Sequence, residues 1–235
     1  MPTAITHRLL AERVFSALPT QIQEKISDAS LYYLGAQGPD VLFCLRPFGK
    51  DNLGKALHTE ETYRFFRILL EESRRRQGVF SYACGYITHY CADVCFHPDI
   101  YERMGEKNRI LFHHAMEHAY DGVFLEKYGG GKTLFFYRLK PPKDVSLTGV
   151  CEALGRYAAQ TGRLAPSEEA LHRAIGLYYF FSNRRTPLYR KKYAVRADEF
   201  FCRSRDESVR LIGRFFFGKV ERADFGKHFL TGGAG

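Results

Sequence analysis

The chain has 235 residues, of which 45% are hydrophobic and 15% are aromatic. This composition excludes an intrinsically disordered chain and predicts a domain with a sizeable core. The formal net charge is +9, but residues 1–122 hold 14 Lys and Arg against 15 Asp and Glu, whereas residues 123–235 hold 21 against 11. The basic second half either attracts phosphates, acidic membranes or nucleic acid, or is simply a solvated surface.

Several locations and site types are disfavoured by the sequence. No run of eighteen apolar residues occurs, so we expect no membrane span. The first residues lack the charged start and apolar run of a signal peptide, which favours a cytoplasmic chain with reduced cysteines. No CxxC pair is present, and a cysteine-type zinc site is therefore not expected.

Apolar residues recur with helical spacing along most of the chain. The predicted helices are 5–17, 60–76, 79–96, 108–127, 166–182 and 196–218. Pro98 should end the third helix, because an internal proline removes a helix hydrogen bond. Segments 35–55, 98–107 and 140–144 should be loops, 133–139 is the only fair strand candidate, and 231–235 should be a disordered tail. The sequence therefore predicts an all-α fold with one multi-helix domain over residues 1–230.

Histidines and carboxylates recur four residues apart in two successive predicted helices. His89 is followed by Asp93 and then His97, and His113 is followed by Glu117. Side chains four apart share a helix face, so each His–carboxylate pair can converge on one metal ion. Helical bundles build core metal sites in this way, and mixed imidazole and carboxylate ligands suit zinc, with manganese or iron as alternatives.

A metal-free interpretation stays open at this point, in which the same side chains form a hydrogen-bonded network or lie on solvated faces. Their apolar neighbours favour a metal, because a buried carboxylate needs a compensating partner. The zincin motif His-Glu-x-x-His and the adjacent His-Asp pair of HD-type phosphohydrolases are both absent. His114 and His118 point about 100° away from the ligand face, which favours surface positions.

The order of these residues resembles that of a known family, the zinc-dependent phospholipases C, whose relatives include the P1/S1-type nucleases. The resemblance covers residues 5–121, the expected metal-site part, whereas the basic helical part, residues 122–230, shows no matching motif. The ordered set comprises Thr6-His7, Leu34-Gly35-Ala36-Gln37-Gly38-Pro39-Asp40, His58, His89-x3-Asp93, His97 and His113-x3-Glu117.

The resemblance implies an all-α domain with a trinuclear zinc cluster in a cleft between helices. It implies one zinc bound by Asp40, His58, His89 and Asp93, a second bound by His97, His113 and Glu117, and a third bound in part by His7 and a bridging Asp93. Asp40 is also the family's general base. Secreted members complete the third site with an N-terminal Trp, which this chain lacks. We therefore expect two or three zinc ions per chain.

The resemblance predicts a zinc-dependent phosphodiesterase, a phospholipase C-like hydrolase that uses the cluster to activate water. The expected partner is a phosphate-ester substrate, including a phospholipid at a membrane surface. Its anionic group could be recognised by Arg184, Arg185, Arg190, Lys191 and Lys192.

Two alternatives to this activity remain. A P1/S1-like nuclease would stack bases on aromatics such as Phe180 and Phe181, although these fit a core stripe better. Glu117 disfavours it, because the nucleases typically carry Asp there, so nucleic acid is the less favoured substrate. The second alternative is a metal-binding protein without hydrolytic activity.

Overall fold

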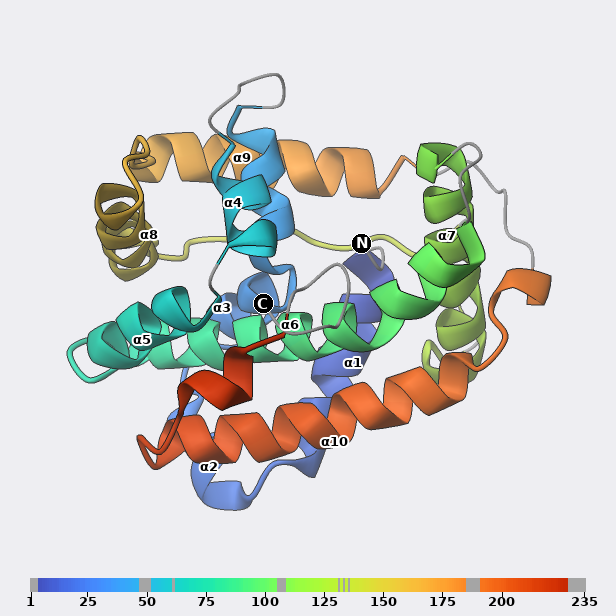
Figure 1. The fold of residues 1–235 in the computed structure, drawn as a ribbon, viewed down its shortest axis with the longest axis horizontal. Coiled ribbons are helices and arrows are strands. Elements are labelled where there is room, and N and C mark those ends of the chain that lie inside the picture. Colours follow the sequence, from blue (N-terminus) through green and yellow to red (C-terminus); the bar gives the residue numbers. More distant parts are fainter. Residues whose placement is uncertain are drawn as a thin grey trace.

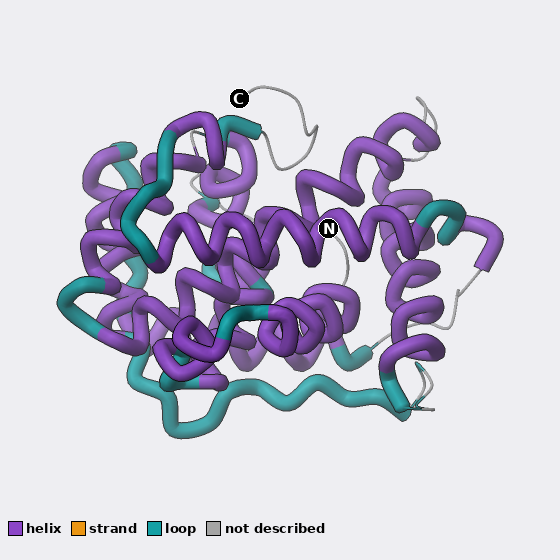
Figure 2. Tube along the Cα trace, turned by 90° about the horizontal axis from the view of Figure 1, so that it is seen from below, coloured by secondary structure: helices purple, strands orange, loops and turns teal. Residues whose placement is uncertain are grey.

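The computed structural model describes residues 4–46, 52–60, 62–104, 109–130, 132, 134, 136–184 and 191–227. Within these ranges all regular elements are helices, which confirms the predicted all-α class (Figure 2). The elements are α1 (Ala4–Ala17), α2 (Thr20–Lys25), α3 (Ala29–Ala36), η1 (Gly38–Cys44), α4 (Leu53–Thr59), α5 (Thr62–Ser73), α6 (Gln77–Met104), α7 (Arg109–Tyr128), α8 (Thr148–Gln160), α9 (Glu168–Ser182), η2 (Lys191–Tyr193), α10 (Ala197–Phe216) and η3 (Arg222–Phe225). None of these helices is long and apolar enough to cross a bilayer.

Helix α6 is the centre of the molecule. It packs against α1, α3, α5, α7, α8 and α10, and nearly all of its side chains from Val79 to Ile100 are buried. In Figure 1, α9 and α10 lie on opposite sides of α6. A helix covered in this way can carry polar residues deep inside the protein, which is where the His–carboxylate pairs of α6 lie.

Helices α3 and α6 touch through their backbones at two glycines. A Cβ at Gly85 would lie 1.9 Å from the carbonyl oxygen of Tyr32, and a Cβ at Gly35 would lie 2.0 Å from that of Tyr82. No side chain fits at such distances, so glycine is required on both helices. The contact brings the end of α3, and the η1 turn that follows it, against the next turn of α6.

The prediction that Pro98 ends its helix was wrong, because α6 continues to Met104 with Pro98 inside it. Proline cannot donate a hydrogen bond to the carbonyl of Val94, so the last turns depend on tertiary contacts. The Tyr120 hydroxyl donates to Asp99 Oδ2 at 2.9 Å, and Ile100 is fully buried. These contacts anchor the turn of the helix that directly follows the proline.

Other departures from the predicted elements are local. The expected loop 35–55 contains η1 and the start of α4, where the Asn52 side chain accepts a hydrogen bond from the backbone N–H of Lys55 at 3.0 Å. Helices α2, α3 and α8 were not predicted. The described residues of segment 133–139 form no strand, and the expected disordered tail, 231–235, lies outside the described residues.

Candidate metal centre

The eight residues proposed as ligands come from five elements and meet at one place. His7 lies on α1, Asp40 on η1 and His58 on α4. The remaining five lie on α6 (His89, Asp93, His97) and α7 (His113, Glu117). Seven of these residues are at most 2% exposed, and His113 is half-buried. The fold therefore gathers them into one buried centre, although their roles as ligands stay a prediction.

In one part of the centre, the imidazoles of His58 and His89 each face the carboxylates of Asp40 and Asp93. His58 Nε2 lies 3.1 Å from Asp40 Oδ1 and 3.6 Å from Asp93 Oδ2. His89 Nε2 lies 3.8 Å from Asp40 Oδ1 and 3.3 Å from Asp93 Oδ2. Ligand atoms bound tetrahedrally to zinc at about 2.0–2.1 Å lie about 3.3 Å apart. These four separations lie near that value, and three of the four exceed the length of a good N–H···O hydrogen bond.

Asp93 faces histidines on both sides. Its Oδ1 lies 3.5 Å from His7 Nε2, whereas its Oδ2, which faces His58 and His89, also lies 3.9 Å from His97 Nδ1. His7 in turn stacks on His89, with 4.1 Å between the ring centroids. The ligand atoms of His7, Asp40 and His89 also lie within 4.8 Å of one another, so His7 can join either carboxylate.

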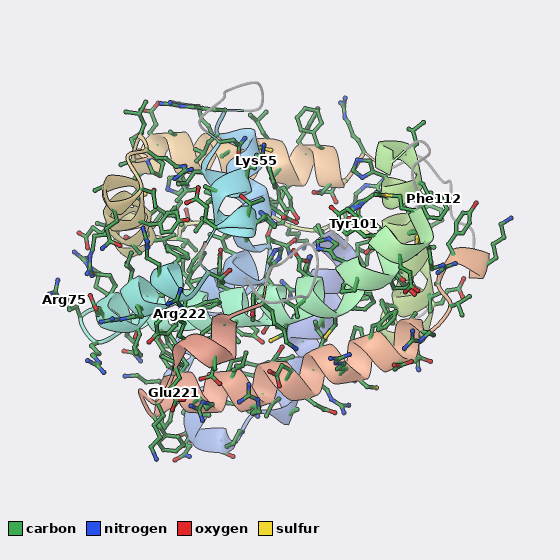
Figure 3. All side chains as sticks on the ribbon, viewed as in Figure 1. Lys55, Arg75, Tyr101, Phe112, Glu221 and Arg222 are labelled. Carbon is green, nitrogen blue, oxygen red and sulfur yellow. The ribbon has the colours of Figure 1, made fainter. Side chains whose placement is uncertain are left out.

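A second group lies where α6 and α7 meet. The ligand atoms of His97, His113 and Glu117 all lie within 4.8 Å of one another, and His113 Nε2 lies 2.7 Å from Glu117 Oε1. Tyr101, on the last turns of α6, lies beside them with its ring centroid 5.9 Å from that of His97 and 5.7 Å from that of His113 (Figure 3). Tyr101 is 36% exposed, so this group borders solvent.

Backbone carbonyls orient two of the imidazoles. His58 Nδ1 lies 2.7 Å from the carbonyl oxygen of Gly54, and His89 Nδ1 lies 3.3 Å from that of Ala36. A carbonyl oxygen only accepts, so each Nδ1 is the donor, and in the neutral ring each Nε2 faces the centre as a lone pair. Metal-binding histidines use their second nitrogen in this way.

Gly38 explains why the sequence needs glycine just before Asp40. Its φ is +54°, and a Cβ there would lie 2.4 Å from the His89 ring. The left-handed backbone and the close approach both favour glycine, and together they let η1 turn Asp40 toward His89. The motif at residues 34–40 therefore contains a residue that shapes the backbone, Gly38, as well as the proposed ligand Asp40.

Asp121 holds the first turn of α1, and so it positions His7. Its Oδ1 accepts hydrogen bonds from the backbone N–H of Thr6 at 2.8 Å and from the Thr6 hydroxyl at 2.7 Å, all buried. These bonds satisfy donors that an isolated helix start would leave open. The sequence shows Asp121 one turn after Glu117, but only the fold shows that it contacts α1.

The centre contains buried polar atoms that lack hydrogen bonds within the described part of the chain. They include both nitrogens of His7, Oδ1 of Asp40 and both carboxylate oxygens of Asp93. An unsatisfied buried carboxylate is costly, and a bound cation removes that cost. The donor set, imidazole nitrogen plus carboxylate oxygen, is one that zinc accepts. The residues therefore fit a zinc centre.

The protonation states of three of these groups differ in how well they suit a metal. Burial holds the pKa of His7 well below 6.5. Burial opposes the charge of Asp93, but His89 and His97 outweigh it and hold the pKa of that carboxyl well below 3.8. Burial also works against the charge of His89, and there Asp93 and Asp40 prevail and raise the pKa. Neutral imidazole and ionised carboxylate are the forms that bind metal, so His7 and Asp93 suit a metal as they stand, whereas a metal must compete with a proton at His89.

His114 lies on the surface, as its position off the ligand face predicts. Its side chain is 59% exposed, and its Nδ1 lies 3.2 Å from Glu117 Oε2. Glu117 thus places one oxygen on each of two neighbouring histidines. His114 is therefore placed to orient Glu117, and its i,i+3 spacing from that residue is the signal that could have indicated this contact.

One comparison with known proteins identifies the family of this chain. The family model described as zinc-dependent phospholipase C matches residues 6–162. The chain belongs to this zinc-dependent phospholipase C family. The match continues past the last predicted ligand, Glu117, and takes in α8, so the family domain extends beyond the 5–121 segment read from the sequence. No curated protein and no solved structure matches the chain.

Membership of the zinc-dependent phospholipase C family supports a metal-dependent, phospholipase C-like hydrolase with zinc as its cofactor. It implies a phosphoester or lipid substrate. Of the basic residues predicted to bind the anionic group, Arg185 and Arg190 lie outside the described residues, and the side chain of Lys191 is not described. Arg184 and Lys192 are both exposed.

Proposed function

We propose that this protein is a zinc-dependent phosphodiesterase that cleaves phospholipids in the manner of a phospholipase C. The observation that carries the proposal is the buried centre in which the imidazoles of His58 and His89 each lie 3.1–3.8 Å from carboxylate oxygens of Asp40 and Asp93. Family membership supplies the reaction class.

The proposed ligand sets follow the pattern of the family. Asp40, His58, His89 and Asp93 would hold one ion, and His97, His113 and Glu117 would hold a second. His7, which lies next to Asp93 and His89, would contribute to a third. When bound, such ions supply Lewis-acid stabilisation of the phosphate charge and a more acidic water.

The residues of the chain carry out the remaining work. Asp40, which is 2% exposed, is proposed to orient the attacking water and accept its proton, because an ionised carboxylate is a suitable base. Attack forms a new phosphorus–oxygen bond and breaks the bond to the leaving oxygen, which takes up a proton. Substrate would enter beside Tyr101 and His113, the more exposed edge of the centre.

Metal analysis by mass spectrometry of protein purified without added metal is the first test. We expect two or three zinc ions per chain. A chain that carries no metal, and gains none when zinc is added, would mean that the histidines and carboxylates form a polar network instead.

Replacing Asp93→Asn tests the centre directly. This change removes the charge that four histidines face, so we expect loss of metal and loss of phospholipid hydrolysis. Asp206→Asn, at a side chain on α10 that is 66% exposed, is the matched control and should keep both. Full turnover by a metal-replete Asp93→Asn protein would contradict the assignment.

A nuclease remains the second candidate because of one correction to the sequence interpretation. Phe180 and Phe181, which were expected in a core stripe, are 47% and 61% exposed, and the Arg184 guanidinium lies 3.9 Å from the Phe180 ring centroid. Exposed rings beside a cation can stack on bases. Cleavage of single-stranded DNA, without cleavage of glycerophospholipids, would favour this candidate.

A further inference from the structure

Helix α9 has an apolar outer face that the core does not use. Leu177, Phe180 and Phe181 are 44%, 47% and 61% exposed. Their spacing of three and four residues places them on one side of the helix. Large apolar side chains gathered on a surface in this way mark a contact with another molecule or a membrane.

Basic residues surround this apolar face. Arg184 stacks on Phe180, and Arg173, one turn before Leu177, is 63% exposed and pairs with Glu169. The backbone of Leu139 exchanges two hydrogen bonds, both 2.9 Å, with the side chain of Asn183. That pairing brings exposed Lys140 to the end of the same helix.

We infer that this face of α9 docks the protein on a lipid bilayer that contains anionic lipids. Leucine and phenylalanine enter the boundary between headgroups and acyl chains, while flanking Arg and Lys remain with the lipid phosphates. The inference rests in part on the proposed function, because a phospholipid substrate is presented at a bilayer. A bilayer fits better than nucleic acid, since Leu177 offers apolar surface but no ring for a base to stack on.

The other face of α9 contacts the segment that carries the candidate centre. The Tyr178 hydroxyl donates to Gln37 Oε1 at 2.9 Å, in a buried hydrogen bond. Gln37 directly precedes η1, which carries Asp40, and α9 packs along η1. A protein docked through the outer face of α9 therefore holds its hydrolytic centre one helix away from the lipid.

The chain has no tryptophan, so a single introduced Trp reports on its own environment. Phe181→Trp should show a blue-shifted emission when vesicles of phosphatidylcholine with phosphatidylglycerol are added. Phe217→Trp is the matched control, because Phe217 is also exposed (60%) and also lies near a basic residue, Lys219. It directly follows α10, which lies on the other side of α6 from α9. It should show no shift.

Vesicle sedimentation of two variants without tryptophan completes the test. The double variant Phe180→Ser, Phe181→Ser should bind vesicles at least about tenfold more weakly, because two phenyl rings no longer enter the bilayer. Arg184→Gln should lose affinity for the anionic vesicles and show little change with phosphatidylcholine alone. An unfolding midpoint equal to that of the unchanged protein would show that the variants fold.

Three outcomes would overturn the inference: equal shifts at both tryptophans, no shift at Phe181→Trp, or a response of Phe181→Trp to single-stranded DNA but not to vesicles. Metal content and hydrolysis of a soluble short-chain phosphodiester, measured on the same preparations, report on the proposed function separately. The serine variant should keep both, so failure of docking and failure of the hydrolase assignment give different results.

Discussion

Removal of the bound metal should destabilise the fold, and the structure sets the scale of the effect. Three buried carboxylate oxygens, Asp40 Oδ1 and both oxygens of Asp93, have no hydrogen bond within the described residues. Each unsatisfied buried acceptor costs about 1–3 kcal/mol. Because ions would satisfy all three, their removal should lower the free energy of unfolding by about 5 kcal/mol.

For a chain of this length, 1 kcal/mol shifts the unfolding midpoint by about 2–4 °C, so the expected loss is about 10–20 °C. The assay is thermal unfolding, followed by circular dichroism, before and after dialysis against a chelator. Restoration of the midpoint by added zinc would separate metal loss from irreversible damage.

Two variants bracket this measurement. His89→Ala removes an imidazole that faces both Asp40 and Asp93, so its midpoint should respond much less to the chelator. Glu169→Gln changes an exposed carboxylate outside the centre, so its unfolding midpoint should fall after chelation as much as that of the unchanged protein. A midpoint that moves by less than 2 °C after complete removal of metal, judged against the estimate above, would refute the argument from buried carboxylates.

The remaining predictions concern the scaffold. Gly85→Ala should lower the free energy of unfolding by about 3 kcal/mol or more, because its Cβ would overlap a carbonyl of α3. Gly176→Ala has open space around its Cβ and should raise the free energy of unfolding by up to about 1 kcal/mol. Equal urea midpoints for the two variants would contradict the packing. Asp121→Ala should cost about 2–4 kcal/mol in urea unfolding, since two buried donors of α1 lose their acceptor, whereas Asp121→Asn should cost less. The bond from Arg210 lowers the pKa of Glu207 below 4.5, so this pair stabilises the fold above that pH and the effect disappears as the pH falls through the lowered pKa. At a side chain that is 40% exposed, Glu207→Gln should therefore cost at most about 0.5 kcal/mol at pH 7 and nothing in strong acid, and a larger loss in acid would reverse the assigned sign.

Much of the candidate centre on α6 and α7 could be predicted from the sequence because it depends on one local rule. Residues four apart share a helix face, so His89 with Asp93 and His113 with Glu117 were found by spacing alone. His7, Asp40 and His58 follow no such rule. They reach the centre from three other elements, and only the resemblance to a family pointed to them.

The errors in the predicted fold have identifiable physical causes. Pro98 was expected to end a helix, and contacts of its neighbours Asp99 and Ile100 with the core outweighed the lost hydrogen bond. The glycines and prolines of segment 35–55 favoured a loop, yet Gly38 serves a tight turn into η1 and Asn52 caps α4. Phe180 and Phe181 have core-like spacing, and periodicity cannot show that nothing packs against that side of a helix.

The glycine contact between α3 and α6 has a consequence for which ions the protein accepts. Two backbones in direct contact cannot slide or rotate past each other without a steric clash, and Gly85 lies one turn before His89. The contact therefore fixes η1 and His89 relative to each other. Two imidazoles and two carboxylates held in this way, the proposed ligand set of the first ion, would penalise ions that demand other shapes. Magnesium requires an octahedron of oxygens and retains its waters, so the proposed centre would discriminate against magnesium.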